Sequence, residues 1–114
     1  MVTPTAASVV LISFPFSDLS RTKLRPAVVL ASADLDDWIL CQVTSNAYAD
    51  AHAVEISDPD FLTGGLRRTS YARPGKLFTA NRSLIVAEVG ILKGESFELI
   101  IEAVVKLLRN NIQP

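Results

Sequence analysis

The 114-residue chain is 49% apolar and 20% charged, which is typical of a single globular domain and excludes an intrinsically disordered chain. Its net charge of −1 argues against a protein constitutively coated with nucleic acid, and no apolar run approaches the roughly 20 residues that cross a bilayer. We therefore expect one domain over residues 1–114, with residues 1–7 as a flexible tail and no signal peptide. The single cysteine, Cys41, lies in an apolar run, so we expect a buried, inert thiol, no disulfide and a cytoplasmic protein.

Runs of apolar and alternating residues predict six or seven short strands along most of the chain. We expect strands at 8–14, 27–32, 38–44, 52–56, 69–72, 76–79 and 83–92. The second and third should form a hairpin through the short polar link between them. Residues 58–68 contain Pro59 and the pair Gly64-Gly65 and are expected to be loop, and 73–75 (Arg-Pro-Gly) a tight turn. Gly90, inside the last strand, suggests a bulge or a close approach of another backbone.

The end of the chain changes to a helical period. Apolar residues recur at three- and four-residue spacing, at Phe97, Ile100, Ile101, Val104, Val105 and Leu108. Acidic residues near the start of this segment and basic residues near its end suit the helix dipole. Short strands followed by one helix predict a mainly β small barrel, and the helix should lay its apolar stripe on the barrel or on a second subunit.

The cations are unevenly distributed along this acidic chain. Eight of the eleven fall in two segments, 21–25 and 67–82, whereas the acids are mostly elsewhere. If the two basic segments meet in space, they form a local anion site; otherwise they are separate solvated loops, and the charge pattern alone does not decide.

Three short motifs could supply such a site. Pro26 biases Arg25 towards an extended backbone at the expected mouth of a core strand, where a guanidinium could bind a phosphate bidentately or pair with an acid such as Asp18. The strand 38–44 ends in Thr44 and Ser45, which could face a site or simply cap a turn. Arg73 and Lys76 flank Pro74-Gly75 and could give further phosphate contacts or be solvated.

Together, these motifs resemble the MazF/PemK toxin family. The resemblance rests on "VVLISFPFSDLSRTKLRPAVVLAS", "ILCQVTSN", "RPGKLFTANRSLIVAEVGIL" and the terminal helix, spanning about residues 8 to 109. It implies an SH3-like barrel with a C-terminal helix, a homodimer, and the toxin of a toxin–antitoxin module. The implied activity is cleavage of single-stranded RNA without a metal or other cofactor, in which the RNA 2′-hydroxyl attacks the neighbouring phosphodiester. The implied partner is an acidic, partly disordered antitoxin laid over the basic loops.

By the same resemblance, the catalytic residues are Arg25 and Thr44, with Arg25 assigned to charge stabilisation and any part in proton transfer left open. Candidate RNA-binding residues are Lys23, Ser45, Arg73 and Lys76, and an aromatic platform for a base would come from Phe16, Phe14 or Tyr71.

Two departures from the family pattern bear on activity. The family opens its first strand with Gly-Asp, where this chain has Ala7-Ser8, and the stretch at 73–75 lacks the carboxylate that some members carry. The only histidine, His52, is not expected to act as the base. Two alternatives are an inactive relative that binds RNA or a protein partner through the same barrel, and an SH3-like peptide adaptor, for which the sequence offers little aromatic surface.

Overall fold

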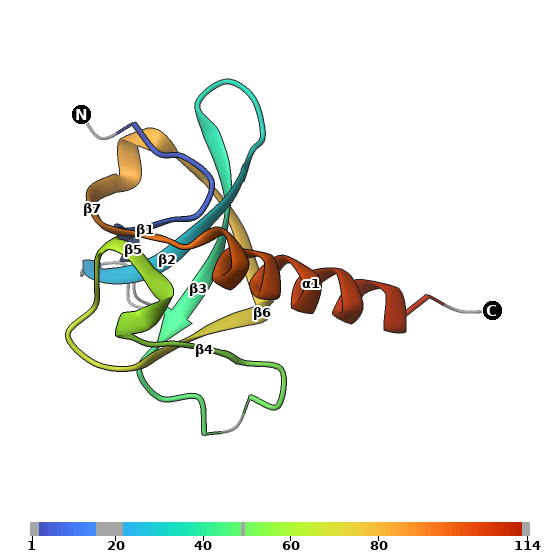
Figure 1. Ribbon diagram of the computed structural model, residues 1–114. Coiled ribbons are helices and arrows are strands. Elements are labelled where there is room, and N and C mark those ends of the chain that lie inside the picture. Colours follow the sequence, from blue (N-terminus) through green and yellow to red (C-terminus); the bar gives the residue numbers. More distant parts are fainter. Residues whose placement is uncertain (1–2, 16–21, 49, 113–114) are drawn as a thin grey trace.

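The computed structural model describes residues 3–15, 22–48 and 50–112 (Figure 1). The strands of this part of the chain are β1 (Ser8–Pro15), β2 (Thr22–Ser32), β3 (Asp37–Thr44), β4 (Val54–Ile56), β5 (Phe61–Gly64), β6 (Ser70–Asn81) and β7 (Ile85–Leu92). Two 3₁₀ turns, η1 (Asp58–Asp60) and η2 (Arg82–Leu84), precede β5 and β7, and the helix α1 (Gly94–Asn110) follows β7.

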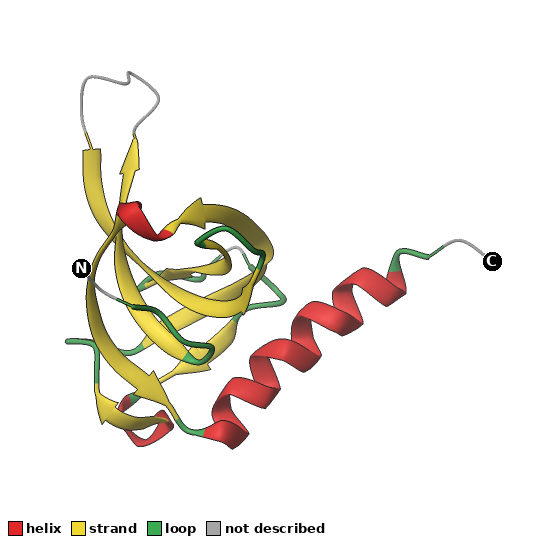
Figure 2. Ribbon diagram, turned by 90° about the horizontal axis from the view of Figure 1, so that it is seen from above, coloured by secondary structure: helices red, strands yellow, loops and turns green. Residues whose placement is uncertain are grey.

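The strands form one antiparallel sheet that curls into a small barrel (Figure 2). Its order is β4-β6-β3-β2-β1-β7-β5, so the two short strands β4 and β5 are at its edges. The hairpin expected between β2 and β3 is present and pairs Ala27 with Gln42 and Ser32 with Trp38. The predicted mainly β barrel with a C-terminal helix is therefore confirmed.

Helix α1 covers one part of the barrel core. Ile100 and Val104 are buried in the same cluster as Val9, Val28 and Ile56. Phe97 and Ile101 of the predicted apolar stripe are partly buried and pack against this cluster, whereas Val105 and Leu108 are exposed. The end of α1 extends past the barrel (Figure 2).

Strand β2 begins five residues earlier than the expected 27, at Thr22. Arg25 therefore lies within a strand and not at the mouth of one, and Pro26 pairs with Leu11 of β1. Pairing with β3 begins only at Ala27, so the missing N–H of Pro26 does not interrupt that ladder. Of the basic segment 21–25, residues 22–25 are strand, and residue 21 lies outside the described residues.

The turn predicted at Arg73-Pro74-Gly75 is wrong, because β6 runs through it. Cys41 pairs with Leu77 and Val43 with Ala72, so one residue of β3 faces four residues of β6 in an extended bulge. The bulge absorbs a proline that cannot donate to the ladder, and its ring is buried.

Two further features concern the segment 58–68 and the strand that follows β6. The expected loop at 58–68 contains η1 and the edge strand β5. The close approach predicted at Gly90 is confirmed, because a Cβ there would lie 2.7 Å from the Phe61 ring and 2.8 Å from the Thr63 carbonyl oxygen. The pairing of β1 with β7 also shifts register beside Gly90.

The N-terminal residues lie against the barrel from residue 4 onward, although the sequence suggests a flexible tail over 1–7. Pro4 is fully buried. The Ala7 N–H donates to the Val29 carbonyl at 2.9 Å, and the Ala7 carbonyl accepts from Leu92 N–H at 2.9 Å. These two bonds hold Ala7 at φ +77°, a left-handed conformation that favours glycine.

Candidate RNA-cleavage site

A cavity of about 490 Å³ opens where β2 begins and β3 ends, beside the segment that follows β5. Its lining comprises Leu11, Lys23, Leu24, Arg25, Pro26, Val43, Thr44, Ser45, Gly65, Leu66, Arg67, Arg68, Ser70 and Val89. The register that pairs Ala27 with Gln42 places Arg25 beside Thr44 when it is continued along the two strands. The two residues assigned to catalysis therefore converge on one cavity.

The cavity is strongly cationic. Lys23 and Arg25 come from β2, and Arg67 and Arg68 come from the segment between β5 and β6. No carboxylate belongs to the lining formed by the described residues. Parts of the two basic sequence segments thus lie side by side here, which is the arrangement that the anion-site interpretation requires.

The sequence motifs do not point to Arg67 and Arg68 as site residues. They follow Gly64-Gly65 in what looks like an ordinary polar loop. Gly64 has φ +69°, and a Cβ on it would lie 2.1 Å from the Val89 carbonyl oxygen, so the chain passes tightly against β7 before it turns towards the cavity. In the sequence, the glycine pair shortly before two arginines is the feature that could have indicated a tight turn delivering these cations to a site.

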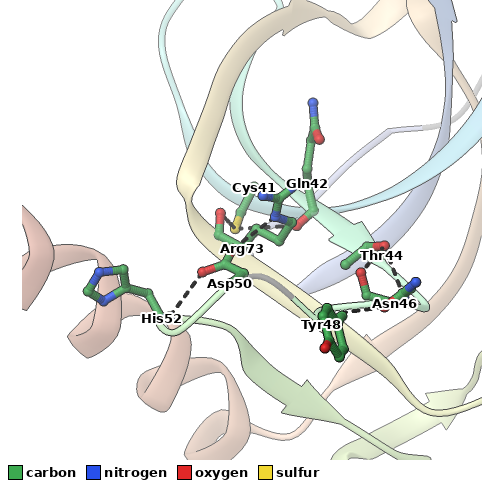
Figure 3. Close-up of polar contacts among 8 residues, drawn as sticks. All are labelled: Cys41, Gln42, Thr44, Asn46, Tyr48, Asp50, His52 and Arg73. Carbon is green, nitrogen blue, oxygen red and sulfur yellow. Dashed lines mark hydrogen bonds and ion pairs between the residues drawn. The ribbon is translucent and has the colours of Figure 1, made fainter.

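Thr44 is held by a short turn at the end of β3 (Figure 3). Its Oγ1 donates to the Asn46 carbonyl at 3.1 Å and accepts from the Asn46 N–H at 3.1 Å. Its side chain is half-buried, whereas Ser45 is exposed at the rim. To donate to a bound phosphate, the Thr44 hydroxyl would turn from the Asn46 carbonyl, while its oxygen can keep the bond from Asn46 N–H.

Arg73 and Lys76 do not line this cavity. Arg73 Nε donates to Asp50 Oδ2 at 2.8 Å, and this hydrogen bond is the main cause that lowers the pKa of Asp50 (Figure 3). Lys76 is exposed in the β6 bulge. Phe16, expected as a stacking residue, lies outside the described residues, and so do the side chains of neighbours Phe14 and Pro15.

The buried thiol predicted at Cys41 is confirmed. Its Sγ donates to the Arg73 carbonyl at 3.1 Å, and burial raises the pKa of the thiol to about 11. His52 is exposed, does not line the cavity, and uses its backbone N–H to donate to Asp50 Oδ1. Among the described residues, no three His, Cys, Asp or Glu side chains gather as metal ligands. No helix in this part of the chain is both long and apolar enough to span a bilayer.

Residues 5–108 match the family described as the PemK-like, MazF-like toxin of type II toxin–antitoxin systems. The chain belongs to this family. The match covers the whole barrel and almost all of α1, in agreement with the resemblance seen in the sequence. A search among curated proteins finds no match.

Solved structures share the fold across nearly the whole chain. MazE–MazF (Form II) from Deinococcus radiodurans has a TM-score of 0.75 at 18% identity, covering 96% of this chain and 98% of that one. An endoribonuclease in complex with its cognate antitoxin from a Mycobacterial species has a TM-score of 0.69 at 17% identity, covering 100% of both chains. The Mycobacterium tuberculosis toxin MazF-mt6 has a TM-score of 0.66 at 16% identity, covering 88% of this chain and 96% of that one.

Proposed function

We propose that this toxin is an endoribonuclease that cleaves single-stranded RNA in the cavity lined by Arg25 and Thr44. The observation that carries the proposal is the convergence of these two side chains in a cavity with three further cations and no described carboxylate. Such a lining attracts a polyanion locally although the whole chain carries a net charge of −1. The structures of similar fold include a protein named an endoribonuclease.

The reaction we propose is a transesterification within the RNA. The 2′-oxygen forms a bond to phosphorus while the bond from phosphorus to the 5′-oxygen breaks, leaving a 2′,3′-cyclic phosphate and a 5′-hydroxyl. The 2′-hydroxyl loses its proton and the leaving 5′-oxygen gains one, so no external nucleophile or redox partner is consumed. Negative charge accumulates on the non-bridging phosphate oxygens in the transition state, and donors aimed at them supply the largest catalytic effect.

The residues divide into two roles. The Arg25 guanidinium supplies a planar, bidentate pair of donors, and the Thr44 hydroxyl supplies one more. Lys23, Ser45, Arg67 and Arg68 surround these groups and would hold the neighbouring phosphates. No imidazole or carboxylate belongs to the described lining, so these residues act by charge stabilisation and positioning and the proton acceptor is not assigned among them.

Arg73 and Lys76 are proposed only as contacts to RNA beyond the scissile phosphate. Both lie on β6, outside the cavity. Asp50 offsets much of the charge of Arg73, whereas Lys76 is exposed. We expect Lys76 to change RNA affinity weakly and uniformly across sequences, as a phosphate contact does.

We further propose that an acidic antitoxin segment occupies the same cationic cavity and so competes with RNA. Family membership makes this chain the toxin of such a pair, and two of the similar structures are complexes with an antitoxin. Four cations lining one cavity favour a carboxylate-rich segment by the same electrostatics that favour RNA. A cellular RNA substrate would place this activity in the cytoplasm.

We also propose a homodimer that pairs copies of α1. Val105 and Leu108 are exposed on α1, and Val105 lines, with the partly buried Ile101, a shallow hollow that includes Glu98 and Arg109. The acids of this side lie towards the start of α1 and the bases towards its end, so an antiparallel pair would match opposite charges while covering the apolar stripe. Val105→Glu should shift sedimentation at micromolar concentration towards a monomer, and an unchanged dimer would place the interface elsewhere.

The decisive experiment measures cleavage of a long single-stranded RNA in EDTA. Arg25→Ala should lower the rate at least ~1000-fold and Thr44→Ala roughly 100-fold, because each removes a transition-state donor. Arg25→Lys keeps the charge but loses the bidentate geometry, so it should remain strongly impaired. Lys76→Ala is the matched cation outside the cavity and should stay within a few-fold of the unmodified chain.

Circular dichroism and sedimentation would show that each variant keeps its fold and assembly. Cleavage retained by a folded Arg25→Ala protein would remove Arg25 from the mechanism. RNA bound but never cleaved by the unmodified chain would point instead to an inactive relative that acts by binding.

A further inference from the structure

A second hollow adjoins the cationic cavity at the rim that carries Ser45. It measures about 350 Å³ and is lined by Ser45, Asn46, Ala47, Tyr48 and Tyr71. Ser45 also lines the cavity with Arg25 and Thr44, so the two spaces share a wall. A chain passing through the cavity can therefore continue into this hollow.

Both tyrosines of the sequence line this hollow. Tyr71 is half-buried in β6, where it pairs with Thr44 of β3 and Glu55 of β4, so the sheet fixes its position. Tyr48 lies on the loop after β3 and is 98% exposed, so its ring contributes almost nothing to the core. A rigid aromatic wall and an exposed aromatic ring thus bound the same space.

The loop that carries Tyr48 is tied to the candidate catalytic hydroxyl (Figure 3). Thr44 Oγ1 holds both backbone groups of Asn46, and Asn46 Oδ1 accepts from the Tyr48 N–H at 3.1 Å. These bonds organise the backbone from Thr44 to Tyr48 before any ligand arrives. A group that binds against Tyr48 is therefore positioned relative to Thr44.

We propose that Tyr48 and Tyr71 form a slot for one unpaired nucleobase of the RNA, next to the phosphate held by Arg25 and Thr44. Aromatic rings accept the flat face of any base, and Tyr loses little conformational entropy when it binds. Ser45 and the NH₂ group of Asn46 supply hydrogen-bonding groups at the same hollow for the edge of the base. An unpaired base in single-stranded RNA has both the flat shape and the adjacent phosphate that this pair of spaces requires.

This inference rests on the proposed function for the phosphate site, but it makes a separate claim about affinity. The test therefore uses an RNA that cannot be cleaved. The cleavage site would first be mapped with the unmodified chain, and a fluorescent oligonucleotide would then be made with a 2′-deoxynucleotide at the scissile position. Its dissociation constant would be measured by anisotropy at fixed salt, with abasic residues introduced one position at a time around that site.

Tyr48→Ala should weaken binding of the intact oligonucleotide about 5- to 100-fold, and Tyr48→Phe should stay within about twofold because the ring remains. At one abasic position, the RNA affinity of the unmodified chain should fall by a similar factor. The affinity of Tyr48→Ala for the same abasic oligonucleotide should be no weaker than its affinity for the intact one. Tyr71→Leu should reproduce the Tyr48→Ala pattern at the same position. Because Tyr48 is 98% exposed, its variants should unfold at the temperature of the unmodified chain.

Two results would overturn the slot. One is a Tyr48→Ala protein that binds the intact RNA within twofold of the unmodified chain, as expected if the ring serves a protein partner. The other is that, at every abasic position, removing the Tyr48 ring and removing the base weaken binding independently, so that the two losses of affinity multiply. Either result can occur while cleavage still depends on Arg25, so failure of the slot is distinguishable from failure of the ribonuclease assignment, which would appear as no cleavage by the unmodified chain.

Discussion

Asp60 connects the turn η1 to the start of α1, and its removal should weaken the whole fold. Its Oδ2 accepts from the Ser57 N–H at 2.8 Å and from the Ser57 hydroxyl at 3.3 Å, and its Oδ1 accepts from the Ser96 hydroxyl at 2.9 Å. Its carbonyl oxygen accepts from the Lys93 N–H at 2.8 Å. One residue thus fixes the angle at which α1 leaves the barrel.

The magnitude follows from the side-chain bonds. Hydrogen bonds to a charged group contribute about 1.5–3 kcal/mol each when well shielded. Asp60 is only half-buried and one of its bonds is long, so we expect Asp60→Ala to lower the free energy of unfolding by about 2 kcal/mol. Asp60→Asn can rotate to satisfy part of the set without the charge, so about 1 kcal/mol is expected.

The pH dependence has a defined sign. Burial alone would raise the pKa of Asp60, but the hydrogen bonds from Ser57 and Ser96 and the nearby charge of Lys93 outweigh it, so the pKa lies below its usual value. A carboxyl with a lowered folded pKa stabilises the protein above the unfolded pKa of about 4 and loses this contribution as pH falls through the folded value. The stability gap between the unmodified chain and Asp60→Ala should be constant above about pH 5 and narrow below about pH 4.

Urea unfolding followed by circular dichroism at several pH values would measure both effects. A loss of about 2 kcal/mol corresponds to a fall in the midpoint of roughly 1 M urea. Asp58→Asn is the matched control, because Asp58 is an exposed acid in the same turn. Equal midpoints for Asp60→Ala and the control, or a gap that widens in acid, would refute the reasoning.

Three further predictions concern single positions, all read from unfolding curves or thiol chemistry. Ala7→Gly should raise the free energy of unfolding by about 0.5 kcal/mol, because glycine adopts φ +77° without strain. Ala103→Gly in α1 is the control and should lower it by about 1 kcal/mol. If both substitutions destabilised the protein, Ala7 would not be strained. Gly90→Ala should cost about 1–3 kcal/mol by forcing a Cβ against Phe61, and a neutral result would contradict the close approach. The Cys41 thiol, with its pKa raised to about 11 by burial, should react with a disulfide reagent at pH 8 only after unfolding.

The sequence predicted those elements whose hydrophobic period matches their environment. The alternation and apolar runs of β1 and β3 and the helical period of α1 were sufficient. The first residues of β2 were missed because Thr22 to Arg25 are mostly polar, and they become strand only by pairing with β1. The bulge in β6 was read as a turn because Pro74-Gly75 has turn chemistry, whereas pairing with β3 on both sides keeps the strand continuous.

The candidate site was predictable to the extent that motif resemblance carried it. Arg25 and Thr44 follow from family motifs, but Arg67 and Arg68 reach the cavity only because β5 pairs with β7 and directs the following segment back across the barrel. Arg73 illustrates the opposite case. Its place before Pro74 suggests a phosphate contact, yet Asp50, 23 residues earlier in the chain, binds its guanidinium. Such long-range partners are set by the fold and leave no local signal.

The Arg73–Asp50 pair lies at the far end of the loop that carries Tyr48, and this position gives Arg73 a role that a phosphate contact would not have. Asp50 Oδ1 also accepts from the His52 N–H, so Asp50 fixes the loop near its return to β4, as the Thr44–Asn46 bonds fix its start. The two roles predict opposite signs for Asp50→Ala. If Arg73 mainly contacts RNA, removing its acidic partner should strengthen binding, whereas if the pair holds the loop, binding should weaken about as much as in Tyr48→Ala. Because the Asp50 side chain is only 12% exposed and accepts a hydrogen bond on each oxygen, we expect loop support to dominate and Asp50→Ala to weaken RNA binding. Tighter RNA binding by Asp50→Ala would show instead that Arg73 acts mainly as a phosphate contact.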